Sequence, residues 1–270
     1  MIPQRPAFFP EDGGVRPDPR FIPSAGGAQW RGTRQEQNDV LFISDYDPMK
    51  GLLVALADGI GLEADAGRAA EAAVNAIRQD FIREEPMEDP RRQTLRMAGA
   101  AHAAIRALNE ANQERNLPPV GAAAACALVR NRRLAFSAVG NVRVFLIRAG
   151  ALLQLSRDHL LSLEAEERDI LSGEAPDIDP EWAKRVTAFA GMESLQKIDT
   201  QQTPVFLIPG DRVLIMSSGL YGVLTEEELS GLACGGPPEQ AAGAIIGRVR
   251  EMHQASQSNI SVALIRFGQI

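Results

Sequence analysis

The stretch "SSGLYGVLTEEEL" at 217–229 joins the end of an apolar segment to the start of a predicted helix. A junction of this kind is a common place for an enzyme to hold a metal ion. Hard divalent cations such as Mg²⁺ need oxygen ligands, mainly carboxylates. At the turn itself the chain has Ser218, whose neutral hydroxyl is a weak ligand for a dication. The sequence therefore raises the question of whether a carboxylate is needed here.

The composition favours a cytoplasmic protein with one large domain or two small ones. Of its 270 residues 45% are hydrophobic, which is enough for a substantial core. The net charge of -7 argues against binding to nucleic acid or to an anionic membrane surface. No apolar run approaches the ~20 residues of a membrane-spanning helix. Cys126 and Cys234 fit reduced thiols better than a disulfide framework.

The predicted organisation is an irregular, Pro/Gly-rich N-terminal arm over residues 1–25 and one folded domain over 26–270. The first 27 residues hold six prolines and four glycines and show no periodicity. The arm could dock on the domain through Phe8, Phe9 and Phe21. A plain extended lead-in is favoured over a short recognition motif for a partner.

From Ala28 onward the sequence becomes regular and predicts layers of sheet and helix. Apolar segments predict strands at 40–44, 51–58, 121–130, 133–140, 142–149, 151–156, twice within 204–218, and at 259–267. Helical periodicity predicts helices at 63–85, 89–116 and 237–254, and Thr225 with Glu228 forms a capping box before another. Hairpins indicate antiparallel sheet, and the grouped helices indicate a layered α+β fold.

Five segments resemble, in order and spacing, those of the metal-dependent protein phosphatases, the type 2C or PPM family. They are "RGTRQEQND", "LADGIG", "SAVGNVRVFLIRAGALLQLSRDH", "IPGDRVLIMSSGL" and "SNISVALI". The resemblance spans roughly residues 28–267, and five ordered segments weigh more than one. It implies a bacterial-type member with a four-layer α-β-β-α sandwich, in which helices flank two antiparallel sheets.

The resemblance also implies a chemistry. In that family two divalent cations, usually magnesium or manganese, share a bridging water and lower its pKa. The resulting hydroxide attacks the phosphorus of a phosphoserine or phosphothreonine in line. Several carboxylates must converge to hold two cations that carry two positive charges each.

Matched residue by residue, the resemblance assigns part of this machinery. Arg34 matches the arginine that holds the substrate phosphate, although an ordinary surface arginine is an equally weighted alternative. Asp39 matches an aspartate of the metal shell, and Asp58 matches the aspartate that bridges both metals. The carbonyl of Gly59 matches a backbone ligand. His159 falls in another matching pair, where a structural role is favoured over a catalytic one.

Four positions depart from the family pattern. Asn38 stands where an acidic residue or Gln is usual, and Asn141, Ser218 and Ser258 stand where the family has aspartates. Two ligand aspartates remain where four or five are expected. Losing these negative charges should remove most of the affinity for two dications.

The sequence therefore favours a pseudophosphatase, a preserved fold that acts as a phosphoprotein-binding or regulatory module with no cofactor in its native state. The alternative is an active phosphoserine/phosphothreonine phosphatase with a reduced metal set. Asp39 and Asp58 would then hold one cation, or at most two, of manganese or magnesium. The expected partner is a phosphoprotein, a protein kinase or a regulatory protein in a bacterial cytoplasm. Neither nucleic acid nor membrane insertion is expected.

Overall fold

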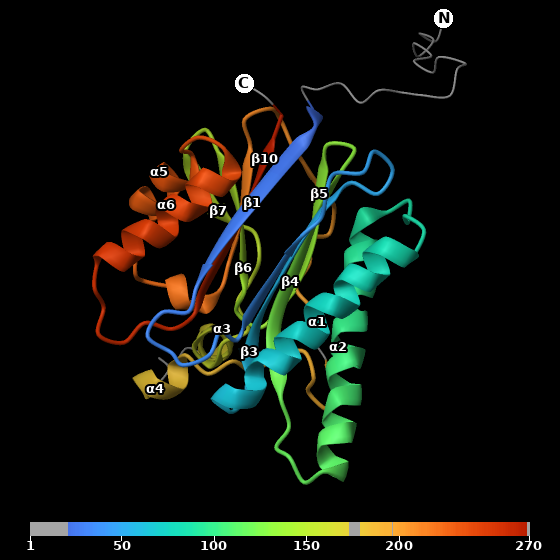
Figure 1. Ribbon diagram of the computed structural model, residues 1–270, viewed down its shortest axis with the longest axis vertical. Helices are drawn as coiled ribbons and strands as arrows, with labels where there is room; N and C mark the ends of the chain where they lie inside the picture. Colours follow the sequence, from blue (N-terminus) through green and yellow to red (C-terminus); the bar gives the residue numbers. More distant parts are fainter. Residues whose placement is uncertain (1–20, 173–178, 196, 269–270) are drawn as a thin grey trace, which may run out of the picture.

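Two five-stranded antiparallel sheets pack face to face in the computed structural model, which describes residues 21–172, 179–195 and 197–268 (Figure 1). The first sheet has the order β1 (Pro23–Trp30), β10 (Ile260–Phe267), β9 (Arg212–Met216), β6 (Arg143–Arg148) and β7 (Ala151–Gln154). The second has the order β2 (Asp39–Ile43), β3 (Leu52–Ile60), β4 (Gly121–Arg130), β5 (Arg133–Val139) and β8 (Val205–Phe206).

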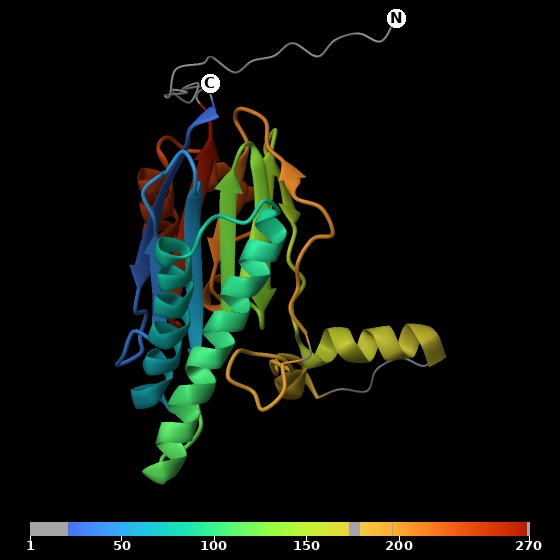
Figure 2. The same cartoon turned by 90° about the vertical axis from the view of Figure 1, so that its right-hand side faces the viewer.

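Helices cover the outer face of each sheet, so the predicted four-layer sandwich is confirmed (Figures 1 and 2). The second sheet is covered by α1 (Glu63–Arg83) and α2 (Pro90–Glu114), and the first by α5 (Glu226–Ala233) and α6 (Pro238–Glu251). Two further helices, α3 (Leu161–Ser172) and α4 (Pro180–Ala183), lie near one end of the sheets. Among the described residues, no helix is both long enough and apolar enough to cross a membrane.

The elements form where the sequence periodicity places them. The predicted inward stripe of α1 is buried, at Ala66, Ala70, Ala73, Ile77 and Phe81. The capping box before α5 is also present, because the Thr225 hydroxyl accepts a hydrogen bond from the Glu228 amide and the Glu228 side chain accepts one from the Thr225 amide. The buried stripe packs α1 against its sheet, and the capping box stabilises the start of α5.

The first strand is the main difference from the sequence prediction. It begins at Pro23, inside the range 1–25 that the sequence predicts to be irregular, and pairs with β10 along its whole length. Its small residues carry little strand propensity but allow close packing, because a Cβ on Gly26 would lie 2.3 Å from the Glu239 nitrogen of α6. Phe21 stacks on Phe267 at 6.2 Å between ring centroids, whereas Phe8 and Phe9 lie outside the described residues.

Strand alternation decides where polar groups meet between the sheets. Alternate residues of a strand face the same side. Leu56, Ile215 and Ala263 face inward in the apolar inter-sheet layer. The next inward positions toward one end of the sandwich are polar, namely Asp58, Ser217 and Ser261. The layer is therefore apolar along most of its length and ends in a polar cluster to which both sheets contribute.

The inter-sheet layer should dominate the stability of the fold. Leu134 is fully buried in it, whereas Leu153 on the edge strand β7 is 57% exposed. We expect Leu134→Ala to lower the free energy of unfolding by about 2–5 kcal/mol, because it leaves a cavity in the core. The matched Leu153→Ala change should stay within about 0.5 kcal/mol. Urea unfolding of both variants measures the difference, and equal losses would contradict this assignment of the core.

Candidate functional site

Two aspartates lie side by side at the polar end of the inter-sheet layer. Asp39 is directly opposite Asp58 in the antiparallel pairing of β2 with β3. The Ser217 hydroxyl donates a hydrogen bond to Asp39 Oδ2 at 2.7 Å, and the Ser218 hydroxyl donates one to Asp58 Oδ2 at 2.8 Å. Ser217 and Ser218 directly follow β9, so the first sheet contacts both carboxyl groups of the second.

Burial makes this carboxyl pair hard to ionise fully. Burial and the nearby charge of Asp58 together raise the pKa of Asp39 to about 8, against the opposing effect of the Ser217 hydroxyl. Burial also raises the pKa of Asp58, whereas the Ser218 hydroxyl, a hydrogen bond with Asp39 and the Arg34 charge lower it. Asp39 Oδ1 is buried and has no hydrogen-bond partner among the described residues. Burial and mutual repulsion therefore disfavour a negative charge on both carboxyl groups at once.

A cavity of about 280 Å³ opens beside Asp58. Its lining includes Arg34, Asn38, Asp58, Gly59, Ser218 and Ser258, so the structure brings six of the residues singled out in the sequence together. Arg34 Nη2 donates a hydrogen bond to the Ser258 hydroxyl at 3.2 Å. The cavity lining thus combines one guanidinium, one carboxylate, two hydroxyls and two side-chain amides.

Asn259 fixes the loop that carries Arg34, although the sequence analysis gave it no role. Its Oδ1 accepts a hydrogen bond from the Asn38 amide at 2.8 Å, and its Nδ2 donates to the carbonyls of Arg31 at 2.8 Å and Glu36 at 3.0 Å. The Asn259 carbonyl also lies only 1.9 Å from where a Cβ on Gly219 would be, so the turn after Ser218 requires glycine. The sequence could have pointed to a role for Asn259 in the site, because it directly follows Ser258.

Asn141 is the one departing position that does not line this cavity. It lies in the turn between β5 and β6, and its carbonyl accepts a hydrogen bond from the Tyr221 hydroxyl. Arg143 stacks over the Tyr221 ring at 3.6 Å from the centroid and forms a salt bridge with Asp158 at 2.6 Å. This network holds the turn after β9 against the β5–β6 turn.

His159 has the structural contacts that the sequence interpretation favours. Its Nδ1 accepts a hydrogen bond from the Gly140 amide at 3.1 Å, and its own amide donates to the Gly140 carbonyl at 2.8 Å. Burial lowers its pKa, so the neutral ring is the favoured form. The neighbouring Asp158 is engaged by Arg143.

The carboxyl pair predicts a pH dependence of stability. Because the pKa of Asp39 is raised in the folded state, its contribution is fully present below the unfolded pKa and is lost as pH rises through about 8. In metal-free buffer the free energy of unfolding should fall between about pH 5 and pH 7 by up to about 1.4 kcal/mol per pH unit.

Asp39→Asn should flatten this slope, measured by urea unfolding at each pH. Asp45→Asn is the matched control, since Asp45 lies in the exposed turn before β3, and it should keep the slope. A parent protein whose stability rises over the same pH range would show that Asp39 is ionised in the folded state.

Comparisons with known proteins agree with this architecture. A curated relative, the serine/threonine protein phosphatase PstP of Mycobacterium tuberculosis, is 27% identical over 182 residues, which are 66% of this chain and 33% of the relative. The chain thus spans about a third of that protein's length.

Solved structures share the fold. A crystal structure of the Mycobacterium tuberculosis serine/threonine phosphatase PstP has a TM-score of 0.74 at 21% identity and covers 92% of this chain and 100% of its own. The catalytic domain of PstP in complex with two manganese ions has a TM-score of 0.73 at 22% identity, with coverage of 92% and 100%. The sequence profile of the family described as Protein phosphatase 2C matches residues 26–173. Because this match extends over more than half of the 270 residues, the chain belongs to the Protein phosphatase 2C family.

Proposed function

We propose that this chain is a pseudophosphatase, a PPM-type domain that binds phosphoproteins without hydrolysing them. One observation carries the proposal: each of the two remaining aspartates is hydrogen-bonded to a serine hydroxyl of the opposite sheet. Each carboxyl group is thereby engaged within the protein, and among the described residues no further carboxylate lines the cavity beside Asp58 to complete a metal shell.

The donor set does not fit two divalent cations. Two dications carry four positive charges, whereas the aspartate pair supplies at most two negative charges. Positions 38, 218 and 258 around the cavity are neutral. Within the described ranges, no group of three or more His, Cys, Asp or Glu side chains could hold a metal ion. Hard cations of this kind need more oxygen charge than that.

The same cavity suits a phosphate group better. Arg34 supplies a guanidinium that can bind phosphate oxygens in a bidentate manner. The hydroxyls of Ser218 and Ser258 line the cavity, and the Ser258 hydroxyl, which accepts a hydrogen bond from Arg34, can donate its own proton to a phosphate oxygen. Asp58 would repel a phosphate, but Arg34 offsets its charge and the proton shared with Asp39 keeps the total charge low. The proposed partner is therefore a phosphoprotein, which includes a phosphorylated kinase or regulatory protein.

A second candidate function has its own supporting observation. Asp39 and Asp58 face each other across β2 and β3, and Asp39 Oδ1 is buried without a donor among the described residues. A single dication could replace the shared proton and bind both carboxyl groups. The chain would then be a metal-dependent phosphoserine/phosphothreonine phosphatase that uses manganese or magnesium.

Hydrolysis of an aryl phosphate with added manganese distinguishes the two functions. We expect turnover at the background rate. We also expect millimolar manganese to leave the melting temperature unchanged, because a metal ion that bound only the folded state would raise the melting temperature. Asp58→Ala is the control that separates a real site from contamination. Metal-dependent turnover that this variant abolishes, or a rise of several degrees, would contradict the pseudophosphatase proposal.

Restoring the missing carboxylates should restore metal binding. Ser218→Asp and Ser258→Asp together add two carboxylates to the cavity beside Asp58, and Asn141 is left unchanged because it does not line that cavity. We expect the double variant to bind manganese at least about tenfold more tightly than the parent, measured by calorimetry.

The matched control is Ser194→Asp with Ser256→Asp, which adds the same charge at exposed positions. It should bind manganese no better than the parent. A folded Ser218→Asp/Ser258→Asp protein without manganese binding would mean that the backbone geometry of the site differs from that of a working phosphatase. Weak phosphatase activity of that variant is a further expected outcome, which needs ligands held to about half an ångström.

A further inference from the structure

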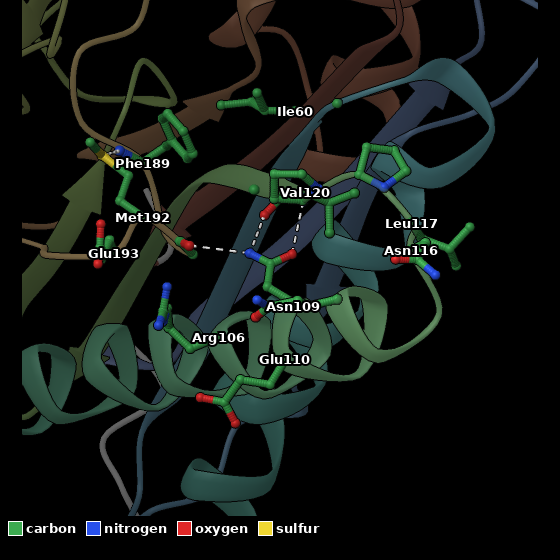
Figure 3. A pocket seen from close by; sticks show the side chains of 16 residues that line it. Ile60, Arg106, Asn109, Glu110, Asn116, Leu117, Val120, Phe189, Met192 and Glu193 are labelled. Atoms are coloured by element: carbon green, nitrogen blue, oxygen red, sulfur yellow. Dashed lines mark hydrogen bonds between the residues drawn. The ribbon is translucent and has the colours of Figure 1, made fainter.

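A second, larger cavity lies next to the cavity beside Asp58 that we propose binds phosphate, here called the phosphate cavity. Its volume is about 950 Å³, and it lies between the C-terminal half of α2, the link from α2 to β4, and the segment 189–193 (Figure 3). Its apolar walls include Ile60, Leu117, Pro118, Pro119, Phe189 and Met192. This volume is in the range of cavities that bind ligands. Leu117 is 39% exposed, so the cavity presents apolar surface to its surroundings.

The walls of this apolar cavity are held together by Asn109 of α2. Its Nδ2 donates hydrogen bonds to the carbonyls of Val120 at 2.8 Å and Gly191 at 3.2 Å, and its Oδ1 accepts one from the Val120 amide at 2.8 Å (Figure 3). The Gly191 amide also donates to His102 Nδ1 at 3.2 Å. Residues 122 and 190 form a β-bridge beside these contacts. The cavity is therefore preformed rather than dependent on a ligand to shape it.

The two cavities meet at the end of β3. Gly61 lines both of them, and it follows Asp58 by three positions in the chain. An extended polypeptide advances about 3.3 Å per residue, so a few residues are enough to reach from one cavity to the other. A phosphorylated side chain in the first cavity would thus place its sequence neighbours at the mouth of the second.

We propose that the apolar cavity binds a large aliphatic side chain, such as leucine, that lies a few residues from the phosphorylated residue of the partner. This inference rests on the proposed function and defines which phosphoproteins the domain selects. The charged side chains around the cavity are Arg106, Glu110 and Glu193, which do not favour a second anionic group. Apolar walls next to a phosphate cavity fit a segment that carries one phosphate and one apolar anchor.

Binding of fluorescent phosphoserine peptides tests the inference. The peptides have a Gly/Ser background and a single leucine placed at each successive position on either side of the phosphoserine, and matched peptides replace this leucine with alanine or the phosphoserine with serine. Fluorescence anisotropy gives the affinities. At one position on one side, leucine should improve the affinity about tenfold over alanine, only in the phosphorylated peptide.

Leu117→Asp should remove that leucine advantage while the affinity for the alanine phosphopeptide stays the same. Leu153→Asp, at an exposed leucine on the distant strand β7, is the matched control and should change neither affinity. Arg34→Ala should weaken all phosphopeptides alike.

The outcomes separate the two proposals. Phosphate-dependent binding that ignores leucine at every position and ignores Leu117→Asp overturns the apolar cavity's role but leaves the proposed function intact. An absence of phosphate-dependent binding for every peptide overturns the proposed function and this inference with it. A leucine effect of equal size in unphosphorylated peptides overturns the coupling of the two cavities.

Discussion

The antiparallel pairing of β2 with β3 places the buried Asp39 directly opposite the half-buried Asp58, and the rest of the site is arranged around this like-charge pair. Leaving both groups ionised would be costly, because burial and mutual repulsion both disfavour the second negative charge. A working metal centre relieves such repulsion with cations. Here the hydroxyls of Ser217 and Ser218 donate hydrogen bonds to the two carboxyl groups. In the proposed function these hydrogen bonds stabilise the aspartate pair in place of cations.

The neighbouring elements explain why this cluster stays ordered in the proposed binding function. Asn259 holds the loop before β2, and the network of Tyr221, Arg143 and Asp158 holds the turn after β9. These contacts hold the segments that bring Arg34 and Ser218 to one cavity. In the apolar cavity, which Gly61 also lines, Asn109 holds two wall segments together through hydrogen bonds to Val120 and Gly191. Both cavities are therefore preformed at one end of the sandwich.

The sequence predicted what depends on local pattern. The strand at 121–130 has the observed bounds, the α1 stripe is buried, and six of the residues assigned to the site line one cavity. It did not predict the strand at 23–30, whose glycines form a strand because α6 and β10 lie against them. Nor could it place Asn141 outside the cavity, since that depends on its contact with Tyr221. The apolar cavity joins segments around 60, 117 and 189 that only the fold brings together.

The central claim is that hydroxyls and a proton, rather than metal ions, satisfy the aspartate pair. Anomalous diffraction from a crystal soaked in manganese tests it most directly, because manganese scatters anomalously and ordinary water does not. The account predicts no anomalous peak beside Asp58 and unbroken hydrogen bonds from Ser217 to Asp39 and from Ser218 to Asp58. One or two strong peaks bound to the Asp58 carboxylate, with the serine hydroxyls displaced, would contradict it.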